Sequence, residues 1–215
     1  MARRALRTAR RAGALAAVAA VTVALAGCFT GPRPTLADGP VMSGDAAVDA
    51  VLQRLDASRT RVFSVGYDVL TRFGDKHTAA TVVQAGPARR VVTVGHVKFI
   101  VDDAEAMTCD LDTSACSGTI DAARISDTQL APDFFATSAA IRLRRDAAAR
   151  IAPPVGSTET IAGQQATCVA VPVTGATETY CALDGGPLAR LDAADLRIDL
   201  TSWSPTVDEA QFQTP

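Results

Sequence analysis

The sequence lacks the short motifs that carry the common catalytic chemistries. It contains no G-x-S-x-G nucleophile elbow, no P-loop and no H-E-x-x-H zinc motif. It has only two histidines, His77 and His96, and neither has neighbouring residues at metal-ligand spacing. We therefore predict a protein that is not an enzyme, has no catalytic residues, and holds no metal and no other cofactor.

Aromatic residues and lysines are also scarce. Aromatic residues make up 5% of the chain, so we expect aliphatic side chains to line most of any apolar cavity.

The first 27 residues hold five arginines and no acidic residue, and removing these charges from the formal net charge of −2 leaves −7. Because an acidic domain is repelled by phosphate backbones, we expect no nucleic acid partner.

The apolar run near the start is too short to span a bilayer. It extends from Ala14 to Ala26, 13 residues, whereas a spanning helix needs about 20. With arginines before it and small residues at its end, this run identifies residues 1–27 as an export signal. The pair Arg10-Arg11 would fit a twin-arginine signal, although the surrounding residues match that motif poorly.

The end of this signal, Leu25-Ala26-Gly27-Cys28, resembles the bacterial lipoprotein lipobox. The resemblance implies that Cys28 receives a diacylglyceryl group and anchors the protein to the outer face of the cell membrane. Two or more acyl chains anchor stably, since each buried CH₂ contributes about 0.8 kcal/mol. The alternative is an ordinary signal peptide whose cysteine occurs by chance. Residues 28–42 are rich in proline and glycine and are expected to form a tether.

The four remaining cysteines form two local pairs: Cys109, Cys116, Cys168 and Cys181. Four cysteines allow three connectivities. A hairpin turn at Thr174-Gly175 would place Cys168 opposite Cys181, and a turn at Asp112-Thr113 would place Cys109 opposite Cys116. We predict these two disulfides, which suit an exported protein. The alternative, a four-cysteine metal site, lacks any C-x-x-C spacing.

Apolar periodicity predicts a helix followed by strands. An i, i+3, i+4, i+7 pattern predicts an amphipathic helix over residues 43–58. Residues 61–73 alternate, with Phe63, Val65, Tyr67, Val69 and Phe73 on one face, as in a long strand. Further strands are expected over residues 78–85, 90–94, 97–101, 158–161, 167–173, 177–183, 188–191 and 195–203.

The alanine-rich segment 127–151 interrupts the strands and predicts one or two helices, with Pro132 in a first turn. Its arginines form a basic face that is either solvated or in contact with anionic lipid headgroups; they are Arg142, Arg144, Arg145 and Arg150. Residues 204–215 are expected to form a loose tail.

This order of elements predicts an α+β domain over residues 43–203, with a curved antiparallel sheet wrapped around helices. The lipobox, the tether, the "FSVGYDVLTRF" strand, the helical insert and the "GQQATCVAVPV…YCALDGGPLARLDAADLRIDLTSW" block resemble the LolA–LppX-like superfamily of envelope lipoprotein carriers and glycolipid-binding lipoproteins. The resemblance implies an antiparallel half-barrel sheet wrapped around or covered by helices, with an apolar cavity for acyl chains. It transfers no catalytic residue.

We therefore expect a monomeric, membrane-anchored envelope lipoprotein that binds or shuttles a lipid, a glycolipid or a lipidated molecule. The same apolar residues could instead fill a core, which would favour an adaptor module that binds an envelope protein partner. The residues expected to line the cavity are Phe63, Val65, Tyr67, Val69, Phe134, Phe135, Ile141, Val169, Val171, Leu196, Ile198 and Leu200.

Overall fold

The computed structural model describes residues 42–103 and 105–215. The expected signal, the acylated Cys28 and residues 28–41 of the tether lie outside the described residues. No helix within the described ranges combines the length and the apolar character that a membrane crossing requires.

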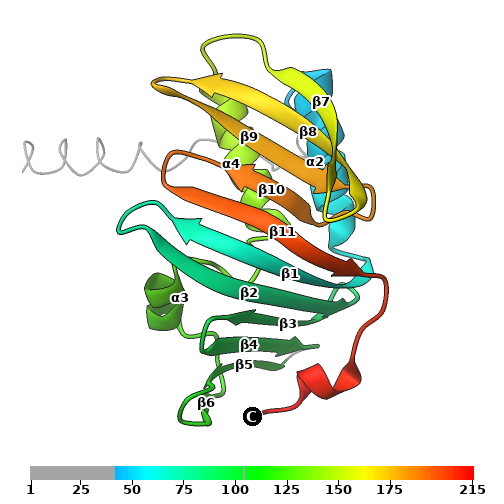
Figure 1. Cartoon of the computed structure of the whole chain (residues 1–215). Coiled ribbons are helices and arrows are strands. Elements are labelled where there is room, and N and C mark those ends of the chain that lie inside the picture. The colour runs from blue at the N-terminus through cyan, green and yellow to red at the C-terminus, as the bar shows by residue number, and fades with distance from the viewer. Residues whose placement is uncertain (1–41, 104) are drawn as a thin grey trace, which may run out of the picture. The chain divides into compact units, whose positions relative to one another are not determined.

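One sheet of eleven strands dominates the described part of the chain (Figure 1). The strands are β1 (Val62–Thr71), β2 (Lys76–Ala85), β3 (Arg89–Val94), β4 (Val97–Asp102), β5 (Glu105–Asp110), β6 (Ala115–Ser117), β7 (Val155–Ile161), β8 (Gln164–Val173), β9 (Ala176–Leu183), β10 (Leu188–Asp192) and β11 (Leu196–Ser204). The helices are α2 (Ala46–Ser58), α3 (Ala122–Thr128) and α4 (Thr137–Ala148), with a 3-10 helix η2 (Glu209–Phe212). The strand order is β6-β5-β4-β3-β2-β1-β11-β10-β9-β8-β7, and every pairing is antiparallel.

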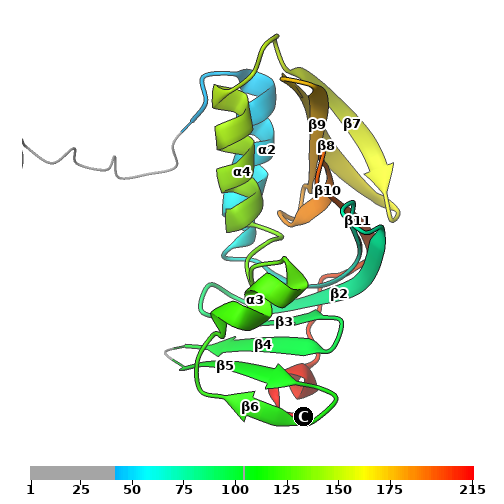
Figure 2. The same ribbon diagram turned by 90° about the vertical axis from the view of Figure 1, so that its left-hand side faces the viewer.

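The three α-helices lie on one face of this curved sheet (Figure 2). α2 packs against α4 and against β8 and β9, and Asp45 caps its first turn by accepting from two backbone N–H groups. α3 covers the other half, where Arg124 pairs with Asp110 of β5 at 2.9 Å. The main apolar core lies between the helices and the sheet. This arrangement confirms the predicted α+β fold.

The sheet bends at Gly66, where β1 meets β11. Gly66 pairs with Ser202 but Tyr67 pairs with Leu200, so β11 carries one extra residue at this point. A Cβ atom on Gly66 would lie 2.7 Å from the Ser202 hydroxyl oxygen. Because such a bulge increases local twist and bending, it curves the sheet at its centre, between the half covered by α2 and α4 and the half covered by α3.

The chain end packs on the face of the sheet opposite the helices. Val207 and Phe212 contact a second apolar cluster formed by Val83, Val91 and Ile100 with Cys109. The Lys98 Nζ donates to the Gln213 carbonyl oxygen at 2.7 Å, and the Arg89 guanidinium lies 4.1 Å from the Phe212 ring centroid. Residues 204–215, expected from the sequence to be loose, therefore make specific contacts with β2–β4.

Both predicted disulfides are confirmed. Cys168 lies directly opposite Cys181 in the β8–β9 hairpin, and Cys109 lies opposite Cys116 in β5–β6. Each bridge therefore joins neighbouring antiparallel strands, and together they suit an exported protein.

Three local expectations need correction. Phe73 does not extend the apolar face of β1, because the strand ends at Thr71 and the Phe73 side chain, in the following turn, is 92% exposed. Pro132 lies in a turn between two helices rather than in a first helical turn. The sequence predicted no helix beginning at Ala122, where α3 begins after its cap Asp121. The residues of α3 show no apolar period, and in the structure none of them is fully buried.

We predict that Gly186→Ala destabilises the protein strongly. Gly186 has a φ of +111° in the β9–β10 turn, and a Cβ there would lie 2.6 Å from the Ser58 Cα and 2.9 Å from its backbone nitrogen. Strain and clash together should cost more than about 1 kcal/mol. Gly163→Ala is the matched control, because Gly163 also has a positive φ of +75° but open space around it. Urea unfolding of the two variants measures the difference in stability. Equal losses of stability would contradict the close approach of the β9–β10 turn to Ser58 of α2.

Candidate functional site

The inner face of β1 is packed rather than open. The Phe63 and Phe135 rings meet edge to face with centroids 5.8 Å apart, and Tyr67 and Phe134 meet similarly at 5.2 Å. The Tyr67 hydroxyl donates to the Leu188 carbonyl oxygen at 2.9 Å, and its burial raises the pKa of Tyr67. These aromatic residues therefore fill the centre of the half-barrel.

An apolar groove of about 320 Å³ remains beside this packed centre. The segment from α3 to α4 forms one wall, and strands β10 and β11 form the other. The lining residues are Ile125, Gln129, Leu130, Ala131, Phe134, Ser138, Ala139, Arg142, Leu191, Leu196 and Ile198. Most of this lining is aliphatic, as expected from the scarcity of aromatic residues.

The groove brings together three of the residues expected to line a cavity: Phe134, Leu196 and Ile198. Eight others are buried in the main core and do not line the groove; they are Phe63, Val65, Tyr67, Val69, Phe135, Val169, Val171 and Leu200.

Ile141 is a correction to the expected cavity lining. Its side chain is 60% exposed, because α4 buries Ala139, Ala140 and Leu143 and directs Ile141 to its outer face. Sequence reasoning also missed Ile125, Leu130 and Leu191, which do line the groove. The short stretch Leu188–Leu191 predicted only a strand, and the isolated Ile125 carries no pattern.

Arg142 and Asp195 form an ion pair at one side of the groove. The Arg142 guanidinium donates to the Asp195 carboxylate at 3.1 Å and lies 3.4 Å from a Glu178 oxygen. The hydrogen bonds from Arg142 lower the pKa of Asp195. Arg142 is largely buried and belongs to the groove wall, whereas Asp195 is more than half exposed and does not line the groove.

A buried acidic pair lies behind Arg142, between α4 and β9. The Tyr180 hydroxyl donates to Asp146 and lies 3.3 Å from Glu178. Burial raises the pKa of Glu178, and the nearby Asp146 raises it further. Burial would also raise the pKa of Asp146, but hydrogen bonds from Tyr180 and Arg145 lower it below its ordinary value. The pair is satisfied by its neighbours and serves to join α4 to the sheet.

The other charged candidates are also occupied. Of the basic face on α4, Arg144 pairs with Asp56 at 2.6 Å and Arg145 with Asp146 at 3.0 Å. His77 lies 3.1 Å from Asp68 across the β1–β2 hairpin and is mostly exposed. Within the described ranges, Glu159, Cys168 and Cys181 come close enough for a metal. Since the two sulfur atoms are bonded to each other, they cannot serve as thiolate ligands.

Comparisons with known proteins show likeness in fold. No family model and no curated protein matches the sequence. One chain of the Pseudomonas aeruginosa MucA/MucB complex superposes with a TM-score of 0.50 at 16% identity, over 79% of this chain and 61% of that chain. A MucB structure superposes with a TM-score of 0.48 at 17% identity, over 80% of this chain and 64% of that chain. The Mycobacterium tuberculosis lipoprotein LppX superposes with a TM-score of 0.41 at 17% identity, over 77% of this chain and 99% of that chain.

The chain thus spans less than two thirds of the matched MucB chains. At 16% identity, the superposition on a chain of the MucA/MucB complex shows a likeness in fold alone.

Proposed function

We propose that this protein is a membrane-anchored, non-enzymatic envelope lipoprotein that binds one acyl chain of a lipid or lipidated molecule. The observation that carries the proposal is the apolar groove between the α3–α4 segment and strands β10 and β11. Burying hydrocarbon there would be driven by about 25 cal/mol per Å² of apolar surface.

The size of the groove supports a single chain rather than several. Its volume of about 320 Å³ falls at the lower end of the roughly 300–1,000 Å³ of small-molecule sites. The packed rings of Phe63, Tyr67, Phe134 and Phe135 occupy the space that a larger cavity would need. We therefore expect a ligand of which one chain is buried and the remainder stays outside.

The anchor belongs to the same proposal. Acylation of Cys28, followed by a tether over residues 28–42, would hold the domain at the outer face of the cell membrane. The two disulfides are consistent with export to that compartment. A groove held close to a bilayer can exchange single chains with it.

A second candidate function is an adaptor that binds an envelope protein. Two observations favour it: the packed inner face of β1, and the likeness in fold to a chain of a MucA/MucB complex. A filled core would leave the surface as the functional part of the molecule.

The two candidates are separated by native mass spectrometry of the full chain, exported in a bacterial host and purified in a neutral detergent. If the groove binds acyl chains, the spectrum should show an added lipid mass. Organic extraction should remove this mass, and added envelope lipid should restore it. A chain that carries no lipid and takes up none from added envelope lipids would overturn the lipid proposal and favour the adaptor.

A further inference from the structure

A second pocket, polar and smaller than the groove, lies on the other side of the turn that connects α3 to α4. The turn residues alternate between the two: Ala131 and Phe134 face the apolar groove, whereas Asp133 and Phe135 line the polar pocket. The polar pocket has a volume of about 120 Å³. A pocket of this size has room for a small polar group.

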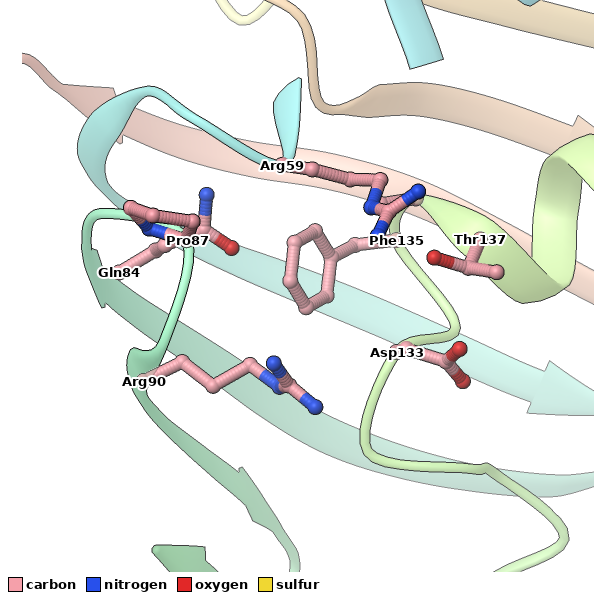
Figure 3. Close-up of a pocket in the computed structure, with 8 residues that line it drawn as sticks. Arg59, Gln84, Pro87, Arg90, Asp133, Phe135 and Thr137 are labelled. Carbon is pink, nitrogen blue, oxygen red and sulfur yellow. The ribbon is translucent and has the colours of Figure 1, made fainter. Parts of the chain in front are cut away.

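Two arginines from separate elements enter this pocket. Arg59 directly follows α2, and Arg90 lies on β3 opposite Gln84 of β2. Figure 3 shows both side chains reaching toward Phe135, Arg59 from the end of α2 and Arg90 from β3. The pocket therefore presents two guanidinium groups on an aromatic wall.

Neither arginine forms an ion pair within the described residues, in contrast to Arg142, Arg144 and Arg190. The Nε of Arg90 is buried and has no hydrogen-bond partner within the part of the chain that the structure describes. Leaving a buried charged donor unpaired is costly. The amide nitrogen of the neighbouring Gln84 is engaged elsewhere, since it donates to the carbonyl oxygens of Ser58 and Arg61.

The first turn of α4 adds positive potential to the same pocket. α4 begins at Thr137, which lines the pocket, and its N-cap residue Ala136 makes no side-chain capping bond. Of the first-turn N–H groups, that of Ser138 donates to the Asp133 carbonyl oxygen at 3.2 Å, and the helix dipole favours anions near this start. Asp133 opposes this with one negative charge, but its carboxylate accepts from the Ser138 hydroxyl. Two guanidinium groups against one carboxylate leave the pocket cationic.

We propose that this pocket binds a phosphate group. Phosphate has several acceptor oxygens to share between two guanidinium groups and the Thr137 hydroxyl, and paired arginines suit it for that reason. The phosphate is either that of a lipid headgroup or free phosphate. This site goes beyond the acyl-chain function, since it shares no lining residue with the groove.

The test is calorimetric titration of the full chain, in neutral detergent, with inorganic phosphate. The parent should bind it with a dissociation constant of about 1 mM or tighter. Arg59→Gln and Arg90→Gln should each weaken binding about tenfold. Asp133→Asn should strengthen it, because it removes the opposing charge. Arg61→Gln is the matched control: it removes the same charge from an exposed position two residues from Arg59 and outside the pocket.

The proposal is overturned if the parent shows no binding at about 10 mM phosphate, or if Arg61→Gln weakens binding as much as Arg59→Gln does. Arg59 is exposed, so its variant should fold even if Arg90→Gln does not, and thermal melting checks this.

Titration with a short-chain phosphatidic acid distinguishes the two sources. Binding about tenfold tighter than that of inorganic phosphate, with the gain lost in Leu196→Trp, assigns the pocket to a lipid headgroup. Equal affinities, unaffected by Leu196→Trp, assign it to free phosphate. If the acyl-chain function fails, inorganic phosphate binding should still persist.

Discussion

Leu196→Trp is expected to abolish most of the lipid binding while leaving the protein folded. Leu196 lies at the start of β11, lines the groove and is only partly buried. An indole at this position would occupy groove volume that an acyl chain needs. Because the side chain is not fully enclosed, the larger group can be accommodated without the strain that overpacking a closed core produces.

The measurement is the lipid mass retained by the full chain in native mass spectrometry. We expect the bound fraction to fall by about tenfold, equivalent to a loss of about 1.4 kcal/mol of binding free energy. Ile141→Trp is the matched control, since Ile141 is 60% exposed on the outer face of α4. Equal retention of lipid by Leu196→Trp and Ile141→Trp would place the ligand elsewhere.

Two similar substitutions in the buried acidic pair, Asp146→Asn and Glu178→Gln, are expected to differ in their effect on stability. Asp146→Asn removes the negative charge that hydrogen bonds from Tyr180 and Arg145 stabilise, and should cost about 1.5–3 kcal/mol near neutral pH. Glu178→Gln replaces a carboxyl whose charged form is disfavoured by burial and by Asp146. We therefore expect this variant to be as stable as the parent, or more stable, near neutral pH.

The pH dependence of stability follows from the directions of the two pKa shifts. The raised pKa of Glu178 means that the folded state holds a proton that the unfolded state releases above the ordinary value of 4.5. The parent therefore loses this contribution as the pH rises through the folded pKa, and the advantage of Glu178→Gln should grow in that window. Asp146, with a lowered pKa, contributes stability that is lost as the pH falls below 3.8.

Urea unfolding between about pH 2.5 and pH 8 measures these differences. Glu105→Gln serves as the control, since Glu105 is an exposed carboxylate on β5. If Glu178→Gln destabilised the protein by more than about 1 kcal/mol at neutral pH, Glu178 would instead be an ionised partner of Arg142.

The sequence predicted the strands better than the helices, and the physical reason lies in their patterns. In β1, Phe63, Val65, Tyr67 and Val69 alternate with polar residues and all four are buried, so a period of two was sufficient. In α4 the apolar part of the buried face consists of Ala139, Ala140, Leu143 and Ala147. Alanine carries little hydrophobic signal, so the exposed Ile141 was assigned to the inside.

The groove itself could not be predicted from the sequence. Phe63 and Ile198 are equally apolar in the sequence and almost equally buried in the structure, yet Ile198 lines the groove and Phe63 does not. What separates them is the path of the α3–α4 segment, which fills the space above one and leaves space above the other. The C-cap residue of α3, Gln129, has a left-handed conformation, a feature of the backbone that no apolar period signals.

The polar pocket was missed for a related reason. Arg59 and Arg90 are 31 positions apart in the chain and come together only because α2 ends above the β2–β3 corner. Nothing in the composition distinguishes them from the arginines that form ion pairs. Only the absence of a partner in the described structure does so.

The most direct test of the acyl-chain site is photo-crosslinking of a fatty acid that carries a diazirine near its methyl end, bound to the full chain and analysed by peptide mass spectrometry. We expect adducts on residues that line the groove, above all on Leu130, Leu191 and Ile198. Adducts confined to exposed apolar residues such as Phe73, Ile141 and Ile151 would show that the chain lies on the surface and would contradict the account.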